Sequence, residues 1–156
     1  MRKVSVQTGL DLLNIVWPEF IELNGAIVRN DGSQVTGAEG LDKTGFEALA
    51  SHQHILDLFL HQAGREGDEG EAKGFWIPTH PDFIAACEFG KKLAQVWFAK
   101  LQQDFPHYRF RVYYTQDDEP IVRFHRVRDD EPAWLSEEDW EPDIADGKVI
   151  VLDSGR

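Results

Sequence analysis

The 156-residue sequence has one cysteine, few basic residues and no long apolar run: 16 Lys and Arg stand against 28 Asp and Glu. A single cysteine excludes an internal disulfide framework and any CxxC zinc or redox site. No apolar run reaches the length of a membrane-spanning helix. The first ten residues, MRKVSVQTGL, lack the apolar core of a secretory signal. We therefore expect a cytoplasmic protein that folds as a single domain over residues 1–156.

Several catalytic motifs are also missing. The sequence contains no GxGxxG, GxxxxGK[ST], GxSxG or HExxH pattern. These patterns build the dinucleotide and phosphate cradles, the serine-hydrolase elbow and the zincin metal site. Cys87 falls on the apolar face of a predicted helix, where a thiol is a small core residue and not a nucleophile. We expect a protein that is not an enzyme, with no catalytic residue and no cofactor.

Local patterns indicate an α+β fold. Apolar spacing predicts helices over residues 8–17, 45–63 and 81–103, and Thr44 with Glu47 fits a capping box before the second. Alternation predicts hairpins over 20–29, where Asn24-Gly25 suits a type I′ turn, and over 108–128. Short strands are expected at 75–77 and 148–152. We expect an antiparallel sheet built from the two hairpins and the short strands, with two long helices packed on one face. The Gly- and charge-rich segment 64–74 is expected to be a mobile loop.

Negative charge is concentrated near the carboxyl end. Residues 129–156 carry 10 acidic and 2 basic side chains, which is −8 of the total −12. Tryptophans among carboxylates suit a basic protein partner, as in inhibitor or immunity-type proteins, because the rings supply buried area and the charges steer association. The predicted partner-binding residues are Asp129, Asp130, Glu131, Trp134, Glu137, Glu138, Asp139 and Trp140. The same charge disfavours nucleic acids and anionic membranes as partners. Simple solubility, with both indoles packed on the core, is the alternative.

A second hypothesis is a metal-binding protein or a metal-dependent enzyme. On the predicted helix 45–63, His54, Asp57 and His61 share one polar face, and imidazole and carboxylate ligands suit zinc or another first-row divalent metal. His80 or His125 would supply a fourth ligand. The alternative is an ordinary solvated helix face.

A third hypothesis concerns the arginines of the hairpin 108–128. Arg109, Arg111 and Arg123 alternate onto one face of the hairpin, where guanidinium groups can bind a carboxylate or phosphate. In the alternative, the acidic segment that follows folds back and neutralises them. The position of residues 129–147 decides between the two.

Overall fold

The structure is a computed structural model that describes residues 5–32, 37–59 and 78–155. The predictions for His61, the loop 64–74 and the strand 75–77 lie outside these residues. In chain order the elements are α1 (Val6–Val16), β1 (Phe20–Leu23), β2 (Ala26–Arg29), α2 (Lys43–Ser51), β3 (Gln53–His54), the 3-10 helix η1 (Leu56–Leu58), α3 (Pro81–Asp104), β4 (Phe110–Gln116), β5 (Pro120–Arg126), α4 (Glu141–Ala145) and β6 (Val149–Asp153).

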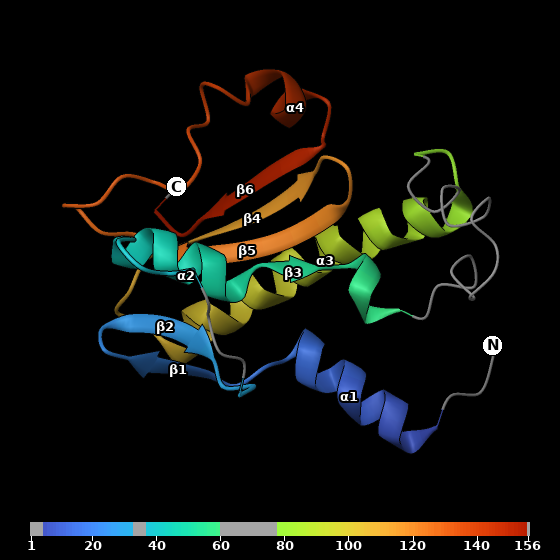
Figure 1. The fold of residues 1–156 in the computed structure, drawn as a ribbon, viewed down its shortest axis with the longest axis horizontal. Helices are drawn as coiled ribbons and strands as arrows, with labels where there is room; N and C mark the ends of the chain where they lie inside the picture. The colour runs from blue at the N-terminus through green and yellow to red at the C-terminus, as the bar shows by residue number, and fades with distance from the viewer. Residues whose placement is uncertain (1–4, 33–36, 60–77, 156) are drawn as a thin grey trace.

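Every strand pair is antiparallel. β1 and β2 form one two-stranded sheet, and the other strands form a four-stranded sheet in the order β3-β5-β4-β6. Figure 1 shows the long helix α3 crossing behind this sheet and the β1–β2 hairpin lying to one side. The predicted α+β class is therefore confirmed.

The first hairpin turns where the sequence predicts it. Asn24 and Gly25 have φ values of 53° and 79°, and a type I′ turn requires positive φ at both positions. The turn pairs Leu23 with Ala26 and fixes the register along both strands. It thereby aims Phe20 and Ile27 into the core.

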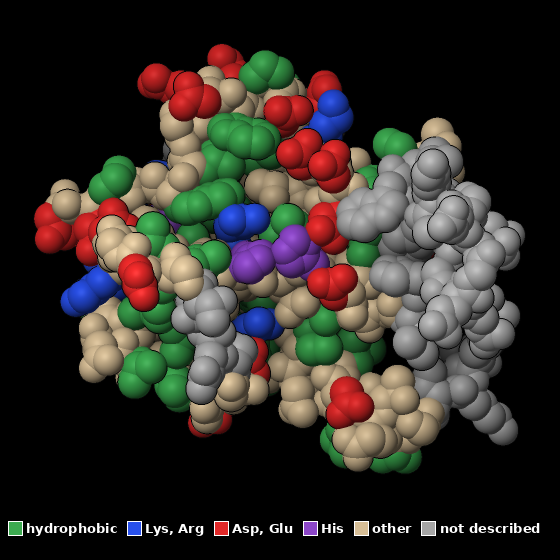
Figure 2. Space-filling view, in the orientation of Figure 1, with side chains coloured by type: hydrophobic (Ala, Val, Ile, Leu, Met, Phe, Trp, Pro, Cys, Tyr) green, Lys and Arg blue, Asp and Glu red, His purple; other side chains and the backbone are tan. Residues whose placement is uncertain are grey.

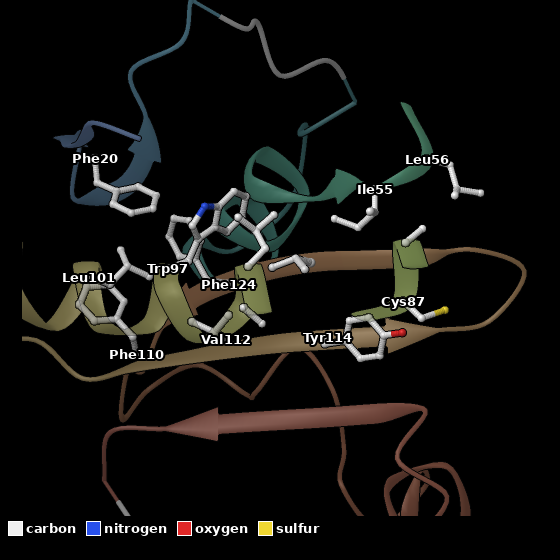
Figure 3. Close-up of a cluster of buried hydrophobic side chains, with 14 of the residues drawn as sticks. Phe20, Ile55, Leu56, Cys87, Trp97, Leu101, Phe110, Val112, Tyr114 and Phe124 are labelled. Carbon is white, nitrogen blue, oxygen red and sulfur yellow. The ribbon is translucent and has the colours of Figure 1, made fainter. Parts of the chain in front are cut away.

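The main core lies between α3 and one face of the four-stranded sheet. The helix contributes eight buried residues that share one face: Phe83, Ala86, Cys87, Gly90, Leu93, Ala94, Trp97 and Leu101. The sheet contributes the alternating residues Phe110, Val112, Tyr114, Val122 and Phe124. Figure 3 shows these rings and aliphatic side chains interdigitating, with Cys87 among them. Gly90 admits Tyr114, because a Cβ at Gly90 would lie 2.9 Å from the Tyr114 ring.

The opposite face of the sheet, here called the outer face, is covered in part by the C-terminal segment. Tyr113, Leu135 and Val149 form a second buried cluster, against which Trp140 and Ile144 pack. α4 lies beside β6 (Figure 1). Residues of the acidic segment therefore lie against the sheet.

The second predicted helix is wrong beyond its first turns. α2 ends at Ser51, and His52 takes an extended conformation as its C-cap. Gln53 and His54 then pair with Val122 and Ile121 of β5. The chain leaves the helix because this pairing satisfies backbone groups along the β5 edge, and such tertiary contacts override local helix propensity. The described residues thus contain one long helix, α3, where two were predicted.

Two helix starts also differ from the prediction. The side chain of Ser5 caps α1 by accepting a hydrogen bond from the Thr8 amide, and the side chain of Asp42 caps α2 in the same way through the Gly45 amide. The apolar spacing in α1 does form a helix, but none of its residues is buried. Within the three described ranges, no helix is long and apolar enough to cross a membrane.

Candidate binding surfaces around the C-terminal segment

The segment that links β5 to β6 is held against the rest of the molecule by contacts along its length. The Glu131 carboxylate accepts a hydrogen bond from the Thr44 amide at 2.7 Å. Leu135 is buried against the outer face, and Glu137 lies 3.8 Å from Arg111. The Trp134 ring lies over the Arg123 guanidinium, 4.1 Å from it. These contacts fix the backbone from which the other acidic side chains project.

The eight predicted partner-binding residues divide into two groups. Glu131 and Glu137 turn toward the protein, and Trp140 is half-buried beside the second cluster. The remaining members face solvent: Asp129, Asp130, Trp134, Glu138 and Asp139. Trp134 is 36% exposed. Among the described residues, none of the four exposed carboxylates has an ion-pair partner within 4 Å.

The three predicted anion-binding arginines differ in the groups that they contact. Arg109 and Arg111 both contact Asp153 of β6, at 3.4 Å and 2.7 Å. The Asp153 side chain is only 2% exposed, so the two guanidinium groups neutralise a buried carboxylate. Burial raises the pKa of Asp153, but hydrogen bonds from the Gly155 amide and Arg111 outweigh it, and the net pKa is lowered. Arg123 has no carboxylate partner of this kind, and burial lowers its pKa to about 10.

Residues 129–147 therefore cover only part of the hairpin that carries the predicted anion-binding arginines. The segment covers the β4 and β6 side of the outer face, where Glu137 reaches Arg111. Arg109 and Arg111 form internal ion pairs, chiefly to β6. The Trp134 indole covers Arg123, whose guanidinium has no ion-pair partner in the part of the chain that the structure describes.

A buried carboxylate that the sequence pattern does not reveal connects α2 to both sheets. Glu47, 0% exposed, accepts hydrogen bonds from the Ile27 and Arg126 amides, both at 2.7 Å. The Arg128 guanidinium donates to its two oxygens, at 2.8 Å and 2.7 Å, and also donates to the Gly25 carbonyl at 3.0 Å. All four donors point at one carboxylate, so Glu47 is a structural centre and not the half of a capping box.

Ser51 performs a related role at the β5 edge. Its hydroxyl accepts from the Phe124 amide at 2.9 Å and donates to the Phe124 carbonyl at 3.0 Å. Side chains of α2 thus complete a strand edge where β3 has not yet begun. A buried backbone polar group without a partner costs free energy, which explains why a polar helix face lies in the interior.

The two described residues of the predicted metal site, His54 and Asp57, do not share a helix. His54 lies in β3 and donates its Nδ1 proton to the Glu119 carboxylate. Asp57 is exposed in η1. Of the two candidate fourth ligands, His80 caps α3 and His125 lies on β5. In the part of the chain that the structure describes, no group of three His, Cys, Asp or Glu side chains could hold a metal ion. The helical spacing on which the hypothesis depended is absent.

His125 is a buried core histidine. It is 2% exposed, donates from Nδ1 to the Arg126 carbonyl, and accepts at Nε2 from the Tyr113 hydroxyl, each at 2.8 Å. Burial lowers the pKa of His125, despite the hydrogen bond to the Arg126 carbonyl and the charge of Glu47. Burial also raises the pKa of Tyr113 to about 12. Both rings are therefore neutral near pH 7.

His52 and His54 form a pair that the predicted helix does not bring together. His52 and His54 contact each other edge to face, with ring centroids 4.9 Å apart. The alternation His-Gln-His could have indicated a strand, but three residues are too few to outweigh the helical spacing around them.

No protein-family model, curated protein or solved structure matches this chain.

Proposed function

We propose that this protein is a binding module that docks a basic protein partner through the exposed acidic surface of its C-terminal segment. The surface consists of Asp129, Asp130, Glu138 and Asp139 with the indole of Trp134. One observation carries the proposal: these four carboxylates face solvent without ion-pair partners among the described residues, while the segment that bears them is anchored.

The anchoring matters because binding is stronger when a surface is already ordered. Leu135 and the Glu131 hydrogen bond hold the backbone in place, so association pays less conformational entropy. Exposed charges of one sign raise the association rate for a cationic partner. A half-exposed Trp134 supplies apolar area at the same surface, as interface hot spots do.

The alternative of pure solubility makes a different demand on the structure. Charge that only keeps a protein dissolved needs no fixed position. Here Glu131 and Glu137 hold the segment against the protein, and the acidic residues next to them in the chain face solvent. That division of labour supports a docking surface, on the general logic of inhibitor or immunity-type proteins that mask a cationic target.

Carbodiimide cross-linking tests the proposal, because it joins a carboxylate to a partner's lysine and mass spectrometry then locates the carboxylate. The test variant replaces the four exposed acids: Asp129→Asn, Asp130→Asn, Glu138→Gln and Asp139→Asn. The control variant removes the same charge from exposed positions elsewhere: Asp11→Asn, Glu39→Gln, Asp117→Asn and Asp118→Asn. Each protein is cross-linked in lysate of the source cells.

We expect basic proteins attached through the four surface acids, with a yield that falls about tenfold in the test variant and is kept in the control. Raising ionic strength from about 50 mM to about 500 mM should also reduce the yield, because screening shortens the range of the charges. Cross-links that map to other carboxylates, equal yields from both variants, or capture that ignores salt would each refute the docking surface.

A further inference from the structure

The pairing of β3 with β5 brings two histidines and an arginine onto the outer face. Gln53 is opposite Val122, whose side chain belongs to the α3 core. Side chains alternate across a strand, so His52 and His54 lie on the other face, the same face as Arg123. Figure 2 shows histidine side chains gathered beside a basic side chain over β3 and β5.

The two imidazoles are oriented by their Nδ1 atoms. His52 donates from Nδ1 to the Leu49 carbonyl at 2.7 Å, and His54 donates from Nδ1 to the Glu119 carboxylate. Each acceptor fixes the ring and leaves Nε2 as the remaining nitrogen. Neither Nε2 forms a hydrogen bond to any described residue. Each Nε2 can therefore contact a bound phosphate, accepting from its O–H group in the neutral ring and donating to its oxygens in the imidazolium form.

Arg123 supplies a fixed positive charge beside them. Across the described residues its guanidinium makes no hydrogen bond and no ion pair, and its Nε is buried without a partner. The Trp134 ring lies 4.1 Å from the guanidinium in a cation–π contact, which orients the guanidinium and shields one of its faces from water. A partly buried cation without a counter-charge is costly, and an anion at its free edge would offset that cost.

Arg126 shows that this arrangement is specific to one face. It also rests on an aromatic ring, that of Tyr108, at 3.6 Å. It lies three residues along the same strand, on the opposite side of the sheet from Arg123. Arg126 has no histidine pair beside it, so it serves as a matched control.

We propose that His52, His54 and Arg123 form a binding site for a phosphate group. A guanidinium and two imidazole nitrogens from three side chains match a tetrahedral phosphate, which offers several acceptor oxygens and, in its monohydrogen form, an O–H donor. A carboxylate has two oxygens, which the guanidinium fork alone would occupy. Glu119 places one carboxylate behind His54, where it accepts the Nδ1 proton, and Arg123 supplies the fixed positive charge of the site.

Nuclear magnetic resonance of the histidine and arginine side-chain nitrogens tests the site. The ¹⁵N-labelled protein is titrated with inorganic phosphate, glycerol 2-phosphate or acetate at fixed pH and ionic strength. We expect saturable shifts of His52 Nε2, His54 Nε2 and Arg123 Nε with both phosphates, and weaker binding of acetate. Saturation by inorganic phosphate alone would identify the free ion as the ligand, and saturation by both would identify a phosphomonoester.

The variants decide whether these residues make the site. Arg123→Gln and His52→Gln should each weaken phosphate binding about tenfold or more, because each removes one of the three side chains that contact the phosphate. Arg126→Gln should leave it unchanged. His52→Gln alters a half-buried side chain and keeps the experiment decisive if Arg123→Gln fails to fold.

Three results would overturn the proposal: shifts that do not saturate, acetate that binds as tightly as phosphate, or equal losses in the Arg123 and Arg126 variants. The phosphate site shares Trp134 with the proposed docking surface but uses none of its four acids. The four-acid variant of that surface should bind phosphate at least as well as the wild type, so the two proposals can fail separately.

Discussion

Removing the negative charge of Glu47 should destabilise the protein more than any other single substitution of a polar residue in the described fold. Glu47→Gln keeps the size of the side chain but replaces one carboxylate oxygen with an amide nitrogen. Each oxygen receives one backbone amide and one Arg128 nitrogen at 2.7–2.8 Å. The substitution therefore turns a donor toward two buried donors and leaves the Arg128 side chain, 7% exposed, without a full counter-charge.

The magnitude follows from these contacts. A hydrogen bond to a charged group is worth about 1.5–3 kcal/mol, and two are lost. Breaking a buried ion pair by removing one partner costs about 3–5 kcal/mol, which agrees with that sum. For a protein of this length each kcal/mol lowers the melting temperature by about 2–4 °C, so we expect a drop of roughly 6–20 °C.

Urea denaturation followed by circular dichroism measures the loss as a fall in the midpoint at constant m value. Glu131→Gln is the matched control: Glu131 lies 3.8 Å from the same arginine, and its remaining oxygen can still accept from the Thr44 amide. We expect the control to cost below about 1 kcal/mol. A loss for Glu47→Gln as small as that of the control would refute the assignment of Glu47 as a structural centre.

Two further substitutions and a pH series complete the predictions. Gly90→Val should lower stability by about 1–3 kcal/mol because its Cβ would lie 2.9 Å from the buried Tyr114 ring, whereas Gly9→Ala on exposed α1 should raise it by about 0.5–1 kcal/mol; thermal melts that rank them otherwise would contradict the packing. His125 is neutral in the fold and its pKa is lowered by burial. Unfolding then takes up a proton below the unfolded pKa of about 6.5, so stability should fall as pH drops from about 7.5 to 5. His125→Gln should flatten that slope, and an unchanged slope would show that other groups cause it.

Elements with a strong local signal could be predicted from the sequence. Asn24-Gly25 requires positive φ wherever it lies between two β-prone runs, and the structure places the turn there. The wide apolar arc of α3 repeats over 24 residues, which is long enough to outweigh competing signals. The alternation of β4 and β5 likewise assigned Val112 and Phe124 to the core. Apolar periodicity and turn preferences depend on residues close together in the sequence, so they can be read without knowledge of the rest of the chain.

The chain after Ser51 could not be predicted in this way. The apolar residues beyond it fit a continued helix, yet Ile55 and Leu56 are buried after a two-residue strand. The deciding contacts are with β5, about 70 residues further along, where the Ile55 amide bonds to the Pro120 carbonyl. The predicted metal site of His54, Asp57 and His61 loses its helical basis for His54 and Asp57, while His61 lies outside the described residues.

The sequence by itself determined where charge accumulates and which residues alternate on the hairpin. Only the tertiary structure decided which charges remain free. Arg111 and Arg123 are equivalent in the sequence pattern, but Asp153 of β6 reaches the first and Trp134 covers the second. The reason is physical: an ion pair or an unpaired cation is a property of distance and desolvation, and both are set by strands and segments that meet only when the chain is folded.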